Sequence, residues 1–221
     1  MASSSAAAHA AQVEKSTRMA APIVPSAAGY RSATRPPRRR APHAPQRRSA
    51  PAGESFVTHD GRSLRIRPIL PHDAAALRRA FARLTPEQVR SRFFYRMNEL
   101  EEAVAERLCN PDPETSAAFV VTDADDAEIR GEARIHIDAV TESAEFAIAV
   151  DPAFIGQGLG RALMQRLLSE CRRRGLVELW GDVLADNHAM LEFVRHLGLT
   201  PVFERGDESS ALRVRFAIPA V

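Results

Sequence analysis

Three glycines at alternate positions mark the segment of this sequence best suited to hold an anion. Gly156, Gly158 and Gly160 stand between an expected strand and an expected helix. Without side chains in the way, main-chain N–H groups approach a phosphate closely, and the start of a helix adds unpaired donors and partial positive charge. Arg161 follows in the first helical turn and adds a charged donor. The spacing therefore predicts a phosphate-binding loop, with a plain glycine-rich turn as the alternative.

Two common phosphate-binding motifs do not fit this loop. The dinucleotide fingerprint requires a third glycine three positions after the second, where this chain has Arg161. A P-loop requires Gly-Lys-Ser/Thr, and the only lysine of the chain is Lys15. The loop is therefore expected to bind the phosphates of another class of ligand.

Glu145 stands on the strand that leads into the loop and is the candidate general base. Alternation along this strand places Glu145 on a face with small residues and sets larger apolar residues on the other face. The small residues are Ser143, Ala147 and Ala149, and the larger ones are Phe146, Ile148 and Val150. Small neighbours leave room for a substrate beside a carboxylate. The alternative is an exposed strand residue or a partner of an arginine such as Arg134, and Glu132 is the reserve candidate.

The elements that must position these residues alternate between strands and helices, which indicates a mixed α+β fold. Strands are expected at 64–68, 118–121, 129–138, 144–150, 177–184, 201–203 and 211–218, and a long helix at 160–174. Shorter helices are expected to open at Pro71, at Thr85 and, with Asn98 as a cap, at 98–108; another follows Asn187. The first three strands after residue 116 are expected to form two antiparallel hairpins.

Charge divides the chain into two parts. Residues 1–53 have a net charge of +8 and hold seven of the fifteen prolines, whereas residues 54–221 have a net charge of −6. A segment so poor in apolar residues cannot offset its ordering entropy, so 1–53 is predicted to be a disordered basic tail. A solvated tail, a targeting segment and a nonspecific nucleic-acid arm remain open for it. The folded domain is predicted to cover 54–221.

Composition excludes several classes of protein. No apolar run approaches the length of about 20 residues that a membrane helix needs. The only cysteines, Cys109 and Cys171, exclude a disulfide scaffold and a multi-cysteine zinc site and favour a reducing, cytoplasmic location. Neither membrane nor nucleic acid is therefore expected as a partner of the folded part, and the oligomeric state is not readable.

The segment from Ala144 to Leu163, AEFAIAVDPAFIGQGLGRAL, resembles the acyl-CoA-binding motif of the GNAT acetyltransferase superfamily. That motif is Gln/Arg-x-x-Gly-x-Gly/Ala at the start of a helix; Gly158 and Gly160 match its small positions, and Ile155 departs from its first. Three further segments resemble the family, the second of them its bacterial protein-lysine acetyltransferase branch: LRIRPILPHD (64–73), RLTPEQVRSRFF (83–94) and NHAMLEFVRHLGL (187–199). The resemblance covers about residues 62–217.

This resemblance implies a three-layer GNAT fold, in which helices flank a central, mostly antiparallel sheet. It also implies that acetyl-CoA is the acyl donor and that no metal takes part. The donor-binding residues that it implies are Ile148, Ala149, Val150, Gly156, Gly158, Leu159, Gly160, Arg161 and Asn187. Asn187 has a plain helix N-cap as its alternative role.

The implied activity is transfer of an acetyl group to a primary amine: a protein lysine, a protein N-terminus or a small amine. The resemblance supports Glu145 as the base that takes the amine proton. Many members place a tyrosine, the acid for the leaving thiolate, where this chain has Val194, so no acid is assigned. A non-catalytic acyl-CoA-binding regulatory module is the alternative.

Overall fold

The structure, a computed structural model, describes residues 53–205 and 210–219. The predicted tail lies, apart from Gly53, outside the described residues. The strands are β1 (Glu54–Val57), β2 (Ser63–Pro68), β3 (Ser116–Asp123), β4 (Ile129–Asp138), β5 (Ser143–Val150), β6 (Glu178–Leu184), β7 (Val202–Arg205) and β8 (Ala211–Ala217). The helices are α2 (Ala74–Arg83), α3 (Pro86–Phe93), α4 (Glu102–Cys109), α5 (Leu159–Arg173) and α6 (His188–Arg195), with 3-10 turns η1 (Pro71–Asp73) and η2 (Pro152–Phe154).

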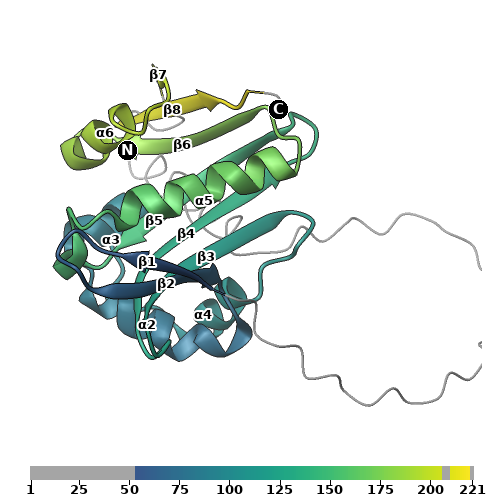
Figure 1. Cartoon of the computed structure of the whole chain (residues 1–221). Helices are drawn as coiled ribbons and strands as arrows, with labels where there is room; N and C mark the ends of the chain where they lie inside the picture. The colour runs from purple at the N-terminus through teal and green to yellow at the C-terminus, as the bar shows by residue number, and fades with distance from the viewer. Residues whose placement is uncertain (1–52, 206–209, 220–221) are drawn as a thin grey trace, which may run out of the picture.

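The strands form one sheet in the order β1-β2-β3-β4-β5-β6-β8-β7 (Figure 1). Neighbouring strands run antiparallel except β5 and β6, which run parallel. Their pairing joins Ser143 to Glu178, Ala144 to Leu179 and Glu145 to Trp180. The expected mostly antiparallel sheet with two successive hairpins is therefore confirmed.

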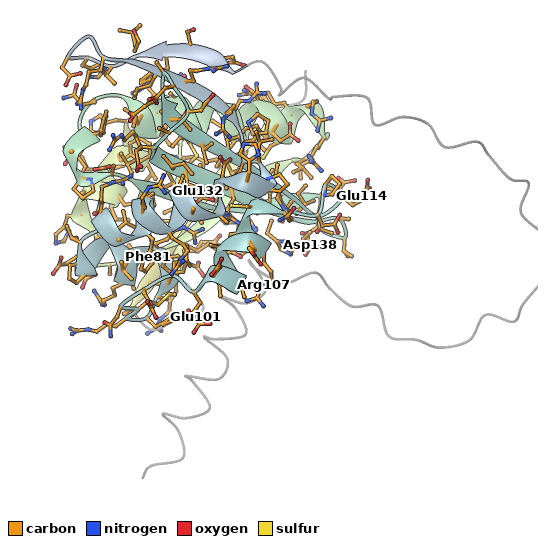
Figure 2. The ribbon with its side chains drawn as sticks, turned by 90° about the horizontal axis from the view of Figure 1, so that it is seen from below. Phe81, Glu101, Arg107, Glu114, Glu132 and Asp138 are labelled. Atoms are coloured by element: carbon orange, nitrogen blue, oxygen red, sulfur yellow. The ribbon has the colours of Figure 1, made fainter. Side chains whose placement is uncertain are left out.

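Helices cover both faces of the sheet. Along β3, Phe119 and Val121 belong to the core beneath α5 and α6, whereas the alternate residues Ala118 and Val120 belong to the core beneath α2 and α4. Figure 2 views the molecule from the side of α2 and α4, with Phe81 labelled on the first of these helices. Alternate side chains of β3 thus contribute to the cores on the two faces of the sheet. The expected three-layer α+β fold is confirmed.

The long helix α5 follows the expected 160–174 closely because its apolar residues recur on one face. These buried residues are Leu159, Leu163, Met164, Leu167, Leu168 and Cys171. The helix carries the glycine loop at its N-terminal end and packs on β3, β4 and β5. It therefore fixes the loop relative to the strand that holds Glu145.

The expected cap at Asn98 is wrong. Helix α4 starts only at Glu102, after an N-cap at Glu101 that makes no side-chain capping bond. Leu100 is buried in the core beneath α2, and its carbonyl accepts a hydrogen bond of 3.0 Å from Arg78 Nε on α2. These two contacts hold residues 98–101 outside the helix.

Strand β1 was not expected, and it adds a hairpin at one edge of the sheet. Glu54 to Val57 pair antiparallel with β2 through a tight turn that ends at Gly61, whose φ is +87°. Figure 1 shows this hairpin reaching the N-terminal end of α5. The turn consequently lies beside the glycine loop, although about a hundred residues separate the two segments in sequence.

Candidate active site

A cleft opens where β5 and β6 separate. Their pairing ends at Glu145 and Trp180, and beyond this fork the two strands no longer pair. The cleft has a volume of about 630 Å³. Its lining comes from the second half of β5, from the glycine loop, from α3, from His59, and from Val183 and α6. One wall is thus the edge of a strand whose main-chain groups on that side lack a neighbouring strand.

All nine of the predicted donor-binding residues line this cleft. They are Ile148, Ala149, Val150, Gly156, Gly158, Leu159, Gly160, Arg161 and Asn187. Residues that sequence spacing alone could not bring together therefore surround one cavity. Glu145 does not line it: it stands one residue before Phe146, the first β5 residue of the lining.

The glycine loop adopts a conformation that favours glycine. Gly156 and Gly158 have φ angles of +77° and +89°, in the left-handed region where a Cβ is strained. Gly158 is the N-cap of α5, so unpaired main-chain donors of the first turn begin here. Leu159 contributes main chain only, because its side chain is fully buried in the core.

Asn187 and Arg161 already have partners within the chain. The Asn187 side chain accepts a hydrogen bond of 3.1 Å from the Met190 main chain, so it caps α6 as its alternative role predicted. Because it also lines the cleft, the two roles are compatible. The Arg161 guanidinium donates to the carbonyl of His196, just after α6. This bond ties the start of α5 to the end of α6.

Glu145 lies at the fork, on the opposite face of β5 from Phe146. Its direct neighbours in the sheet are His136 on β4 and Trp180 on β6. Arg92, at the end of α3, lines the cleft and lies within electrostatic range of the Glu145 carboxylate. Burial lowers the pKa of Arg92, while the carboxylates of Glu132 and Glu145 act in the opposite direction. The Glu145 side chain is half-buried and lies near other charged groups.

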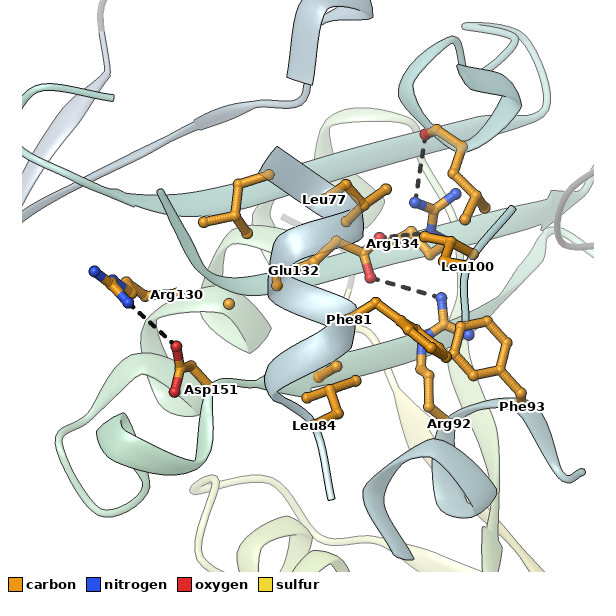
Figure 3. Close-up of a pocket in the computed structure, with 15 residues that line it drawn as sticks. Leu77, Phe81, Leu84, Arg92, Phe93, Leu100, Arg130, Glu132, Arg134 and Asp151 are labelled. Carbon is orange, nitrogen blue, oxygen red and sulfur yellow. Dashed lines mark hydrogen bonds and ion pairs between the residues drawn. The ribbon is translucent and has the colours of Figure 1, made fainter. Parts of the chain in front are cut away.

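Glu132, the reserve candidate, is part of a buried ion network. Figure 3 shows it between Arg134 and Arg92, with N···O distances of 2.5 and 3.6 Å. All three side chains are less than a tenth exposed. They border a small cavity of about 40 Å³ between the sheet and α2. Each carboxylate oxygen of Glu132 is engaged by a guanidinium group, and Glu132 does not line the large cleft.

The cysteines offer no nucleophile. Cys109 is 1% exposed, and Cys171 is fully buried. Burial raises the pKa of each thiol to about 12. Neither forms the thiolate at neutral pH.

Sequence reasoning missed several residues of the cleft, and two of them contact other parts of the lining. Gln88 is the expected capping-box residue of α3, but its Nε2 also donates to the Val150 carbonyl at 3.0 Å. His59, in the turn between β1 and β2, lines the cleft at the glycine loop. No local sequence pattern predicts either contact, because each joins segments that are far apart in the chain.

Among the described residues, no cluster of three or more His, Cys, Asp or Glu side chains is arranged to hold a metal ion. In residues 53–205 and 210–219, no helix combines the length and apolar character that crossing a membrane requires.

Comparison with known proteins identifies the class. The model of the acetyltransferase (GNAT) family matches residues 75–199, more than half of the chain, and the chain belongs to this family. It is therefore an acetyltransferase, with acetyl-CoA as its acyl donor. Family membership thus supports the enzyme over the non-catalytic alternative.

Particular relatives share different amounts of the chain. An acetyltransferase of Pseudomonas aeruginosa, PA5475, is 28% identical over 155 residues, covering 69% of this chain and 83% of its own. The ribosomal protein bS18 alanine N-acetyltransferase of Escherichia coli is 46% identical over 57 residues, or 26% of this chain and 38% of that protein. The GNAT domain of S. lividans PAT has the same fold, with a TM-score of 0.68 at 24% identity over 75% of this chain and 96% of that domain.

Proposed function

We propose that this enzyme transfers the acetyl group of acetyl-CoA directly to a primary amine, with Glu145 as the general base. The observation that carries the proposal is the cleft at the β5–β6 fork, because the predicted donor residues line it and Glu145 stands at the fork, next to Phe146 of the lining. A donor held along β5 brings its thioester toward the fork. The acceptor amine then approaches from the Glu145 face of the sheet.

The donor is held mainly by main-chain groups. The glycine loop and the first turn of α5 offer N–H donors to the diphosphate. The edge of β5 that no strand covers, at Ile148, Ala149 and Val150, pairs with the pantetheine arm as a neighbouring strand would, although the Val150 carbonyl already accepts from Gln88. A main-chain N–H at this edge donates to the thioester oxygen as negative charge develops there in the transition state. Arg161 adds positive charge at the phosphate end.

The acceptor must lose a proton before or as it attacks. An alkylamine has a pKa of about 10.4, so only about one molecule in 10³ is neutral at pH 7. Glu145 takes that proton, directly or through one water molecule, while the C–N bond forms and the C–S bond breaks. The thiolate leaves and takes a proton from water. Val194, at the position of the family's tyrosine, is buried in the core beneath α5 and supplies no acid.

Three acceptors suit this chemistry. The bS18 alanine N-acetyltransferase acts, as its name says, on an alanine of a ribosomal protein, which favours a protein α-amine here. The resemblance to protein-lysine acetyltransferases favours a lysine, and a small amine meets the same chemical requirement. A cytoplasmic location, based on the two thiols, remains part of the proposal.

The test is Glu145→Gln, which keeps the shape of the side chain and removes the base. We expect kcat to fall at least about 100-fold, while the Kd for CoA changes by less than about twofold. Free-thiol release measures turnover across lysine peptides, alanine-terminated peptides and small amines, and calorimetry measures binding. Glu99→Gln, an exposed glutamate in the loop before α4, is the matched control. Turnover of Glu145→Gln equal to the control would remove Glu145 from the mechanism.

A further inference from the structure

The turn between β1 and β2 is fastened to the glycine loop by several contacts. His59 Nδ1 lies 2.9 Å from the Gly156 carbonyl oxygen, and the Asp60 main-chain N–H donates to Gln157 Oε1 at 3.0 Å. The guanidinium of Arg62 stacks 3.8 Å above the ring centre of Phe154, just before the loop. A segment of the β1–β2 hairpin therefore forms part of the wall around the proposed phosphate site.

His59 presents its second ring nitrogen to this site. The Gly156 carbonyl only accepts hydrogen bonds, so Nδ1 carries the proton of the bond between them. A Cβ placed on Gly158 would lie 3.1 Å from His59 Nε2, so Nε2 lies directly against the N-cap of α5. The side chain is exposed and lines the large cleft. Nε2 thus stands beside the N-terminal end of α5, where the unpaired main-chain donors of the first turn begin.

The protonation state of the His59 imidazole determines whether Nε2 repels or attracts an anion. With Nδ1–H bonded to Gly156, a neutral imidazole presents a lone pair at Nε2, which repels phosphate oxygens. The imidazolium presents a second N–H and a positive charge, and hydrogen bonds between charged partners are about twice as strong as neutral ones. Histidine changes between these forms in the range of pH 5–8. A ligand with phosphates therefore selects the protonated form.

We propose that His59, as the imidazolium, donates a hydrogen bond from Nε2 to the diphosphate of acetyl-CoA, so that donor binding takes up a proton. The inference rests on the proposed donor site and extends it to the β1–β2 turn. The glycine loop and the two residues before it, 154–160, contain no titratable side chain. The charged groups of the turn and of β1 form the pairs Asp60–Arg62 and Glu54–Arg166, the latter with α5, and Glu87, Arg92 and Arg161 share the cleft lining with His59. Hydrogen bonds from Arg62 and Thr58 lower the pKa of Asp60 to about 2, so its charge is constant above pH 5.

The experiment compares the full-length protein with His59→Ala and His59→Asn. The Asn amide nitrogen takes the place of Nδ1 and keeps a donor for Gly156, but it provides no atom at the position of Nε2. Calorimetry with dephospho-CoA at pH 6 and pH 8 is the measurement, since its diphosphate does not titrate in this range. We expect the wild type to bind about tenfold more tightly at pH 6 than at pH 8. Both variants should bind about tenfold more weakly than the wild type at pH 6, with no such pH dependence.

S-acetylpantetheine, which lacks the diphosphate, serves as the matched ligand, and its affinity should be the same for all three proteins. Wild-type affinity in His59→Asn would mean that His59 only positions the loop, and the inference would be overturned. Equal losses for both ligands would overturn it as well. Both of these outcomes would leave the proposed donor site in place. If the wild type bound neither dephospho-CoA nor S-acetylpantetheine, the proposed function and this inference would both be refuted.

Discussion

Alanine in place of Gly181 is expected to push a ring into the donor cleft. Gly181 lies on β6 just past the fork, and a Cβ there would be 2.7 Å from Cε1 and 2.9 Å from Cζ of Phe146. The Phe146 ring is buried and packs against Phe216, with ring centres 6.3 Å apart, so it cannot retreat into the core. It must shift toward the cleft that it lines. Such overpacking costs about 1–3 kcal/mol.

Urea unfolding and thermal melting measure this cost. In a domain of this size, each 1 kcal/mol corresponds to about 2–4 °C in Tm. The Kd for acetyl-CoA, measured by calorimetry, should rise with the shift of the ring. Phe146→Leu removes the ring, and in that background Gly181→Ala should cost less than about 0.5 kcal/mol, so the two changes couple. If Gly181→Ala costs the same in both backgrounds, or nothing in either, the packing argument is refuted.

Two further substitutions test the charged groups. Glu132→Gln removes the carboxylate between the buried guanidinium groups of Arg134 and Arg92, and urea unfolding should show a loss of about 3–5 kcal/mol; a loss below about 1 kcal/mol would contradict the network. Hydrogen bonds from Arg173 and Arg174 lower the pKa of Glu170 from 4.5 to about 2. Because the folded-state pKa is depressed, Glu170→Gln should cost about 1 kcal/mol at pH 7 after allowance for solvent screening, and this deficit should shrink as the pH falls from 4.5 toward 2. A deficit that stays constant between pH 7 and pH 3 would show that the ion pairs do not cause it.

Elements with strong local periodicity could be predicted from the sequence. The strand at 129–138 alternates apolar and polar residues along its whole length, and the structure has β4 at the same positions. The helix expected at 160–174 differs from α5 by one residue at each end. For the candidate site, the glycine spacing and the family resemblance were sufficient to select residues that surround one cleft.

What escaped prediction depends on contacts between distant segments. The short strand β1 is largely exposed, so it has little apolar pattern and owes its existence to pairing with β2. The helix start at Asn98 failed because Leu100 is needed in the core beneath α2. His59 contacts Gly156 across 97 residues of sequence, and nothing near either residue indicates that they meet. Register and packing decide such contacts, and a local motif does not encode them.

The unpaired edge of β5 beyond the fork has a consequence for how such enzymes diverge. Main-chain amides are the same whatever side chain each residue carries, so a donor bound along this edge, as proposed, places little constraint on residue types there. Substitutions that preserve the strand and the glycines can accumulate while the choice of coenzyme is inherited unchanged. Acceptor choice has no such protection, because it depends on side chains. As sequences drift, the acetyl acceptor of these proteins should therefore change long before their acetyl donor does.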